Sequence, residues 1–142
     1  DKLLSIHPDT VVYKFDKEGR PIAWAVVVPT STRTMDQFLR KEISERELLD
    51  KATQEKKFES VYVCSAFVLP EHRKKGYAKE LLIEAITKVS ESKTLPLYCW
   101  IYSDEGKRLT DSIAEELGRP IVARPANTKN GEKVSTRIGP VL

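Results

Sequence analysis

Apolar residues along the chain follow two periods, one typical of strands and one typical of helices. Residues 10–31 predict a hairpin, because two runs rich in β-branched and aromatic side chains flank turn residues at 16–19. Two capping-box pairs follow, and each predicts the start of a helix with one packed face: Thr34 with Gln37, and Ser44 with Glu47. The segment 34–57 is therefore expected to be helical.

The second half of the chain alternates strands and helices. Residues 61–69 form a nearly continuous apolar run, typical of a central strand that is buried on both faces. Apolar side chains then recur at helical spacing over residues 78–89, before a strand at 95–102 and a helix at 107–117 that Gly118 would end. A strand, helix and strand in this order favour a parallel strand pair. Two final apolar runs predict a closing hairpin: residues 121–126 and 133–138.

Length and composition are those of one folded domain. The chain has 142 residues, of which 40% are apolar and 32% charged, and residues 1–142 are expected to form a single domain with a sizeable core. No apolar run approaches the ~20 residues of a membrane span, so no membrane partner is expected. Cys64 and Cys99 lie in strand-like runs, which is typical of reduced thiols that pack in a core and favours a cytoplasmic location.

Charge and ligand chemistry exclude two further classes of partner. The formal net charge of +3 is too small to indicate a nucleic-acid partner by itself, and the chain has no second basic cluster. His7 lies near the N-terminal end of the sequence and His72 lies beside a run of cations. No His, Cys or carboxylate cluster has the spacing of metal ligands, so no metal is expected.

One run of positive charge stands at a predicted helix start. Arg73, Lys74 and Lys75 follow the central strand and precede the helix of residues 78–89. The N-terminus of a helix carries roughly +0.5 of an elementary charge, so stability alone would place acidic residues there. Cations become favourable when an anion such as a phosphate lies on the free backbone amides. Gly76 would let backbone approach that ligand closely, whereas a solvated turn is the alternative interpretation.

The residues around this run carry a family motif. Residues 68–78 read Val68-Leu69-Pro70-Glu71-His72-Arg73-Lys74-Lys75-Gly76-Tyr77-Ala78. This segment resembles the acyl-CoA-binding signature of the GNAT superfamily of N-acetyltransferases, Val-x-Pro-x-x-(Arg or Gln)-x-x-Gly-x-(Gly or Ala), at a strand-to-helix junction. The resemblance implies an α/β (α+β) fold with a mixed, mostly antiparallel sheet, a central parallel strand pair splayed to hold CoA, and helices on both faces.

The resemblance also implies which residues bind acetyl-CoA, the expected co-substrate. Backbone amides of residues 73–78 would hold the pyrophosphate. The implied contacts lie on the strand, in the loop and at the following helix start: Phe67, Val68, Leu69, Arg73, Lys74, Lys75, Gly76, Tyr77 and Ala78. The Val68 amide would donate a hydrogen bond to the thioester carbonyl, where negative charge grows in the transition state. Ser103 would contact the pantetheine arm.

Two catalytic side chains of the family are missing from their usual positions. Histone-modifying members have a Glu six residues before the signature Val, where this chain has Tyr62. Many members have a Tyr four residues before the glycine that ends the later helix, where this chain has Ala114. An amine with an ordinary pKa near ~10.4 needs a base at pH 7. Substitutes are Tyr102, which an aromatic packing role would also explain, and Glu59, which would act through water or is a solvated charge.

The sequence thus predicts an enzyme that transfers an acetyl group from acetyl-CoA to a primary amine of a small molecule or peptide, by direct attack in a ternary complex. A non-catalytic acyl-CoA sensor is the alternative, because both familiar catalytic side chains are missing. Members of the family usually begin with a strand and two helices before the hairpin, whereas only nine residues precede Thr10. Either the chain is part of a longer protein, or residues 34–57 form the acceptor wall. Monomer and homodimer are both compatible with the sequence.

Overall fold

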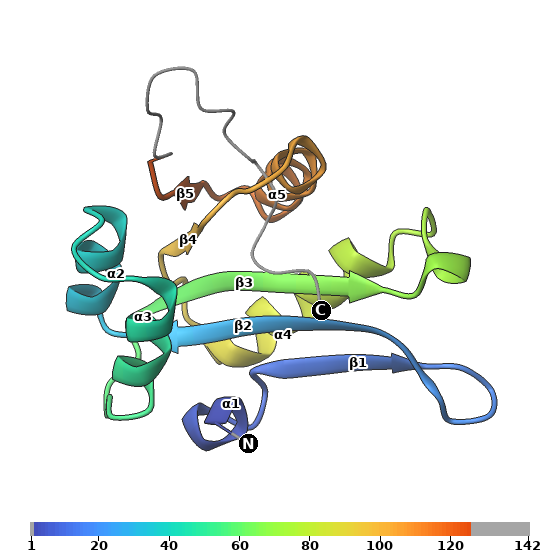
Figure 1. Ribbon diagram of the computed structural model, residues 1–142, viewed down its shortest axis with the longest axis horizontal. Coiled ribbons are helices and arrows are strands. Elements are labelled where there is room, and N and C mark those ends of the chain that lie inside the picture. The colour runs from blue at the N-terminus through green and yellow to red at the C-terminus, as the bar shows by residue number, and fades with distance from the viewer. Residues whose placement is uncertain (1, 126–142) are drawn as a thin grey trace.

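Five strands form one mixed sheet in the computed structural model of the protein, which describes residues 2–125 (Figure 1). The strands follow one another across the sheet in chain order: β1 (Val11–Phe15), β2 (Pro21–Thr30), β3 (Ser60–Val68), β4 (Leu97–Cys99) and β5 (Ile121–Ala123). The first three are long antiparallel neighbours, whereas β4 and β5 add short parallel pairings. The predicted mixed, mostly antiparallel sheet with a parallel pair at β3 and β4 is confirmed.

Helices cover both faces of the sheet, as predicted. Their bounds are α1 (Lys2–Ile6), α2 (Thr32–Leu39), α3 (Glu45–Ala52), the 3₁₀ turn η1 (Pro70–His72), α4 (Tyr77–Ser90) and α5 (Asp104–Leu117). α4 and α5 share one core with Val61 and Val63 of β3, whereas α2 and α3 pack over Tyr62 on the opposite face. Successive side chains of a strand point to opposite faces, so β3 contributes to both cores.

Several predicted elements have different ends in the structure. The hairpin and the helix of residues 78–89 are confirmed as β1, β2 and α4, but the strand predicted over 95–102 is only three residues long. α5 begins at Asp104 rather than at residue 107, because the Ser103 hydroxyl accepts a hydrogen bond from the Gly106 amide and caps the helix. β5 lies in the first run of the predicted closing hairpin and pairs with β4, and residues 133–138 lie outside the described residues.

One of the two predicted capping boxes is wrong. α2 begins earlier than expected, because Ser31 is its N-cap and accepts a hydrogen bond from the Thr34 amide at 3.2 Å. The Thr34 hydroxyl donates instead to Glu55 at 2.8 Å. The second box is confirmed: the Ser44 hydroxyl accepts from the Glu47 amide at 3.1 Å, and the Glu47 carboxylate accepts from the Ser44 amide at 3.0 Å.

A bulge in β3 marks the point where the sheet opens. The register between β2 and β3 shifts between Val26 and Val27, so that Val26 lies opposite Ser65 and Val27 opposite Val63. The parallel pairing of β3 with β4 ends with Val63 opposite Cys99, although β3 continues to Val68. Beyond this point the two segments diverge, and β4 and β5 run away from the plane of the long strands (Figure 1). The predicted splay is therefore present.

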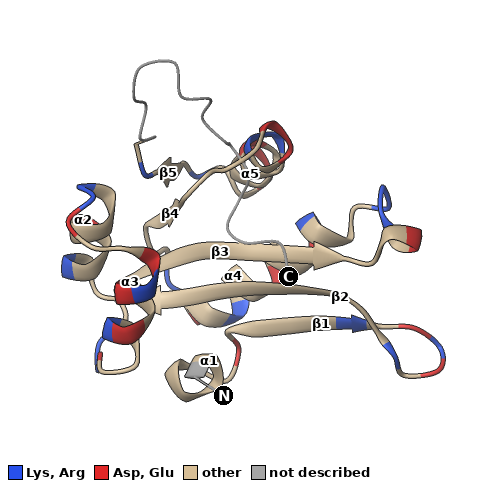
Figure 2. Cartoon of the chain, viewed as in Figure 1, with Lys and Arg blue, Asp and Glu red and all other residues tan. Residues whose placement is uncertain are grey.

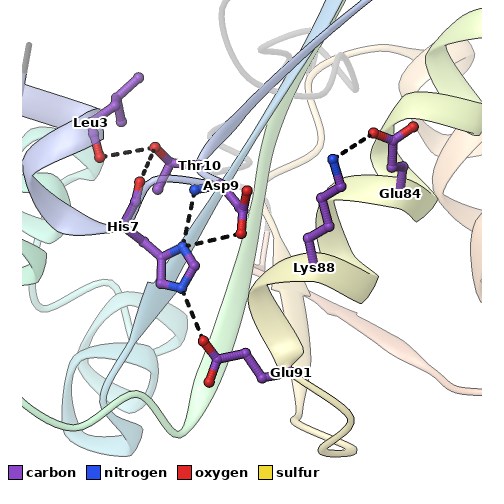
Figure 3. A network of polar contacts seen from close by, with 7 residues as sticks. All are labelled: Leu3, His7, Asp9, Thr10, Glu84, Lys88 and Glu91. Atoms are coloured by element: carbon purple, nitrogen blue, oxygen red, sulfur yellow. Dashed lines mark hydrogen bonds and ion pairs between the residues drawn. The ribbon is translucent and has the colours of Figure 1, made fainter.

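A polar network around His7 ties α1 to the end of α4 (Figure 3). The Thr10 hydroxyl contacts the carbonyl oxygens of Leu3 and His7 at 2.9 and 3.0 Å. The Asp9 amide donates to His7 Nδ1 at 3.0 Å, and His7 Nε2 lies 3.5 Å from the Glu91 carboxylate at the C-cap of α4. His7 therefore has a structural role on the far side of the fold from residues 73–78.

Both thiols are free and buried, as predicted. Burial raises the pKa of Cys99 to about 12 and raises the pKa of Cys64 further above its usual range, so both stay protonated at neutral pH. None of the described helices combines the length and the hydropathy that crossing a bilayer would need.

Candidate functional site

A cavity of about 510 Å³ opens where β3 leaves the sheet. Its walls come from the end of β3, the loop after η1, the first turn of α4 and the start of α5. The cavity brings together eight of the predicted cofactor residues: Phe67, Val68, Arg73, Lys74, Gly76, Tyr77, Ala78 and Ser103. Six further lining residues were not singled out by the sequence for this role: Ala66, His72, Lys79, Glu105, Gly106 and Leu109.

The loop before α4 turns its backbone toward this cavity. Gly76 is the N-cap of α4 with φ of 79°, and Lys74 also has a positive φ, of 65°. Within the described part of the chain, no side chain caps this helix. A Cβ at Gly76 would meet no atom within 4 Å, so the space beside it is open. Free amides and the positive end of the helix dipole make this helix start suited to an anion.

The free edge of β3 forms a second wall. The Leu69 amide donates to Ile22 of β2 at 2.9 Å, and hydrogen bonds alternate along an antiparallel strand. The amides of Val68 and Ala66 therefore point away from β2, toward the side on which β4 has diverged. Both residues line the cavity. This edge can accept an extended ligand as an additional strand, with two backbone donors on one side.

Arg73 holds the loop against the end of β3. Its Nε donates to the Val68 carbonyl oxygen at 3.1 Å, which ties the first cation of the run to the strand. Lys74 lines the cavity beside it. Figure 2 shows these positive charges on the loop that follows β3. The site therefore combines a backbone cradle, positive charge and a free strand edge.

Comparison with known families agrees with this geometry. Residues 3–108 match the family model described as the acetyltransferase (GNAT) family. The chain belongs to the GNAT family. The matched span includes β3, the loop, α4 and the first residues of α5, which together form the cavity. A comparison with curated proteins finds no match.

Four predicted GNAT site residues lie away from the cavity walls or at their margin. The Leu69 amide is already bonded to β2, and Lys75 is exposed and does not line the cavity. Tyr102 directly precedes Ser103, and its ring lies 4.3 Å from that of Trp100. Glu59 precedes the start of β3, at the opposite end from Val68, and its carboxylate accepts from the Thr32 amide at 3.2 Å. Glu59 thus contacts the start of α2.

A second polar cluster lies near the closed end of the splay. The Tyr62 hydroxyl donates to the Glu45 carboxylate at 2.5 Å. Burial raises the pKa of Glu45, and the Tyr62 hydrogen bond and the positive charge of Arg124 offset part of that rise. Burial also raises the pKa of Tyr62 well above its usual range, so the phenol keeps its proton. Glu45 is therefore an ionisable group in a partly desolvated site.

Arg124 closes this cluster from the side of β5. Its guanidinium lies 4.5 Å from the ring centroid of Phe38 and 5.0 Å from that of Trp100. Its Nη1 donates to the Ile43 carbonyl at 3.2 Å, next to the start of α3. Sequence reasoning treated α3 as a packed surface helix and missed Glu45. The one sequence feature that points to Glu45 is its hydrogen-bond partner Tyr62, which stands where histone-modifying members have their Glu.

Proposed function

We propose that this GNAT domain is an acyl-CoA-dependent N-acetyltransferase that transfers an acetyl group from acetyl-CoA to a primary amine of a small molecule or peptide. The observation that carries the proposal is the cavity in which the free edge of β3 meets the open backbone cradle at Gly76. Acetyl-CoA supplies an activated thioester and a pyrophosphate, and the two walls suit these two parts. Transfer is by direct attack within a ternary complex.

The cradle is assigned to the phosphates. Backbone amides from Arg73 to Ala78 donate to the pyrophosphate oxygens, and the start of α4 contributes its positive dipole end. Arg73 and Lys74 add positive charge at the same edge of the cavity. Lys75 lies farther out and adds to the field rather than to a contact. This arrangement explains why three cations follow one another where acidic residues would otherwise stabilise the helix.

The free edge of β3 is assigned to the pantetheine arm and the thioester. Phe67 lines the arm, and the amides of Val68 and Ala66 are the two candidate donors to its carbonyl groups. Ala66 lies two residues, or about 7 Å, closer to the closed end of the splay. We therefore assign the arm to Val68 and the thioester carbonyl to Ala66. A donor fixed before the reaction stabilises the oxyanion without reorganisation.

The opposite lip of the splay is assigned to Tyr102 and Ser103. Ser103 lines the cavity, where its hydroxyl also caps α5. Tyr102 lies one residue closer to the closed end, and we assign to it the proton that goes to the departing sulfur. Glu59 receives no role in this proposal, because it lies at the other end of β3 and contacts the Thr32 amide.

Calorimetric titration with acetyl-CoA tests the cofactor site. Gly76→Asn adds a side chain toward the cavity, and Gly118→Asn is its matched control, because Gly118 also has a positive φ and open space but caps the end of α5. Asn tolerates such φ values, so both variants are expected to fold. Gly76→Asn should weaken binding at least about tenfold, whereas Gly118→Asn should leave it unchanged.

Turnover is tested with a panel of primary amines and peptides, by following acceptor-dependent release of the CoA thiol. Release with at least one amine is expected. No binding of acetyl-CoA at about 1 mM would overturn the cofactor assignment. Tight binding without release for any amine would instead favour a sensor that holds acyl-CoA.

A further inference from the structure

The carboxylate of Glu45 lies where the closed end of the splay meets the face covered by α3. Its partner Tyr62 pairs with Tyr98 just before the parallel ladder ends at Val63 and Cys99. A ligand arm that followed the free edge of β3 from the cavity would run toward this point, because the edge is free only beyond Val63. Glu45 is only partly exposed, so its carboxylate reaches the surface from an otherwise packed cluster.

The groups that face Glu45 come from three segments. Tyr62 and Cys64 lie on β3, Tyr102 follows β4 and acts electrostatically on Tyr62, and Arg124 follows β5. Arg124 is the one cation that acts on Glu45 in the described part of the chain, and it favours the ionised carboxylate. Cys64 and Tyr62 stay protonated at neutral pH because of burial. Glu45 is therefore the group of this cluster that can accept a proton near pH 7.

We propose that Glu45 is the general base that takes a proton from the acceptor amine, directly or through one water, with Tyr62 and Arg124 as positioning residues. This role rests on the proposed acetyltransferase function. The distance along the chain agrees with it: Cys64, whose thiol is influenced by Glu45, lies two residues from Ala66, or about 7 Å along the strand. A carboxylate from α3 thus serves a site in which the strand itself provides only a phenol.

The proton balance assigns each group one task. The acceptor enters as an ammonium ion and gives one proton to the Glu45 carboxylate. Its free amine then attacks the thioester carbonyl carbon, a C–N bond forms and the C–S bond breaks. The second nitrogen proton accompanies the departing sulfur, through Tyr102 in this proposal, so that the products are an amide and a free thiol. Glu45 returns its proton to solvent.

The test compares Glu45→Gln with Glu47→Gln, the same change two residues farther along α3. n-Butylamine, together with the best amine of the acceptor panel, serves as probe. Glu45→Gln should bind acetyl-CoA like the wild type and lose about 100-fold or more of its turnover. The acidic limb of its pH profile should also flatten. Glu47→Gln should keep wild-type turnover.

Tyr62→Phe tests whether the Glu45 carboxylate sets the acidic limb of the pH profile of turnover. A Glu45 with a purely structural role would not move that limb. The substitution leaves the carboxylate in place but removes a hydrogen bond that lowers the Glu45 pKa. Carboxyl carbon NMR of the free protein should therefore show the Glu45 pKa rising in Tyr62→Phe, and the acidic limb of the pH profile should move up with it. Arg124→Gln should also raise the Glu45 pKa and move the acidic limb of the pH profile up, because it removes a positive charge that lowers that pKa.

The outcomes separate this role from the enzyme assignment. Wild-type protein that binds acetyl-CoA but acetylates no amine would overturn the enzyme and this role together. Turnover by the wild type with equal turnover by Glu45→Gln and Glu47→Gln would overturn this role alone. A Glu45 titration that does not respond to Tyr62→Phe would also contradict it, because the carboxylate would not then be held by the phenol.

Discussion

Arg73 has two roles that ordinarily belong to different residues. Its Nε bonds to the Val68 carbonyl at 3.1 Å, which fixes the loop relative to β3, and its charge lies on the cavity wall. The Val68 amide points toward the cavity, so the bond also restrains the strand edge that we assign to the pantetheine arm. Lys75 lies two residues farther along the loop, is exposed and does not line the cavity.

Arg73 and Lys75 are expected to contribute unequally to acetyl-CoA binding. Arg73→Ala should weaken acetyl-CoA binding about tenfold, since it removes one charge near the phosphates and one tie of the loop. Lys75→Ala should weaken binding about twofold, through the screened field alone. Calorimetry at low and at physiological salt checks both. Equal losses in the two variants would mean that the Arg73 bond to Val68 does not matter for binding.

The residues that line the cavity were predictable because their chemistry is local. Eleven residues at one strand-to-helix junction predict a phosphate site, because they combine a run of cations, a glycine and a small residue. Glu45 was not predictable in this way, because the role that we propose for it depends on Tyr62, which is distant in sequence, and on Arg124 near the far end of the described chain. Burial and long-range pairing, which decide its chemistry, leave no periodic pattern.

At the scale of elements, the start of α3 fixes the position of Glu45. The reciprocal Ser44 and Glu47 hydrogen bonds satisfy two backbone amides at that start, and Glu45 is the first residue of the helix. Ser44→Ala should lower the free energy of unfolding by about 1 kcal/mol. Urea denaturation checks this through a lower midpoint at an unchanged slope. Glu47→Gln, which keeps an oxygen acceptor, should lose much less, and an equal loss would contradict the capping-box interpretation.

The ends of some helices and strands are set by the local sequence, and the ends of others are set by tertiary contacts. α4 is found within one residue of the prediction at each end, because its apolar stripe sets its length. β4 is shorter than its apolar run, because the bulge in β3 ends the parallel pairing at Cys99. The predicted N-cap at Thr34 is wrong, because Ser31, directly after β2, caps α2. The Thr34 hydroxyl donates to Glu55 instead.

At the scale of the molecule, one sheet separates two cores with different tasks. The core under α4 and α5 consists mainly of aliphatic side chains and supports the cradle. The core under α2 and α3 contains the aromatic rings of Phe38, Tyr62, Tyr98 and Trp100, and it supports the cluster around Glu45. The splay of β3 and β4 lies between them. A site that needs a cofactor on one side and an acceptor on the other can be assembled at this junction.

The two cores also bury one thiol each, which makes the stability of the whole fold depend on pH. Burial raises the pKa of Cys99 from 9.0 to about 12, so the folded state keeps the thiol neutral while the unfolded chain ionises. The stabilisation is complete below pH 9 and is lost between pH 9 and pH 12, by up to about 4 kcal/mol.

Urea unfolding at pH 8 and at pH 10, under reducing conditions, checks whether the free energy of unfolding falls as the pH rises. Wild-type protein should lose about 1 kcal/mol more than Cys99→Ala between the two values, since the variant has no thiol to ionise. Cys64→Ala should behave in the same way, because burial also raises the Cys64 pKa. Parallel pH slopes for all three proteins would show that the thiols already titrate at their ordinary pKa in the fold, and that both cores admit water.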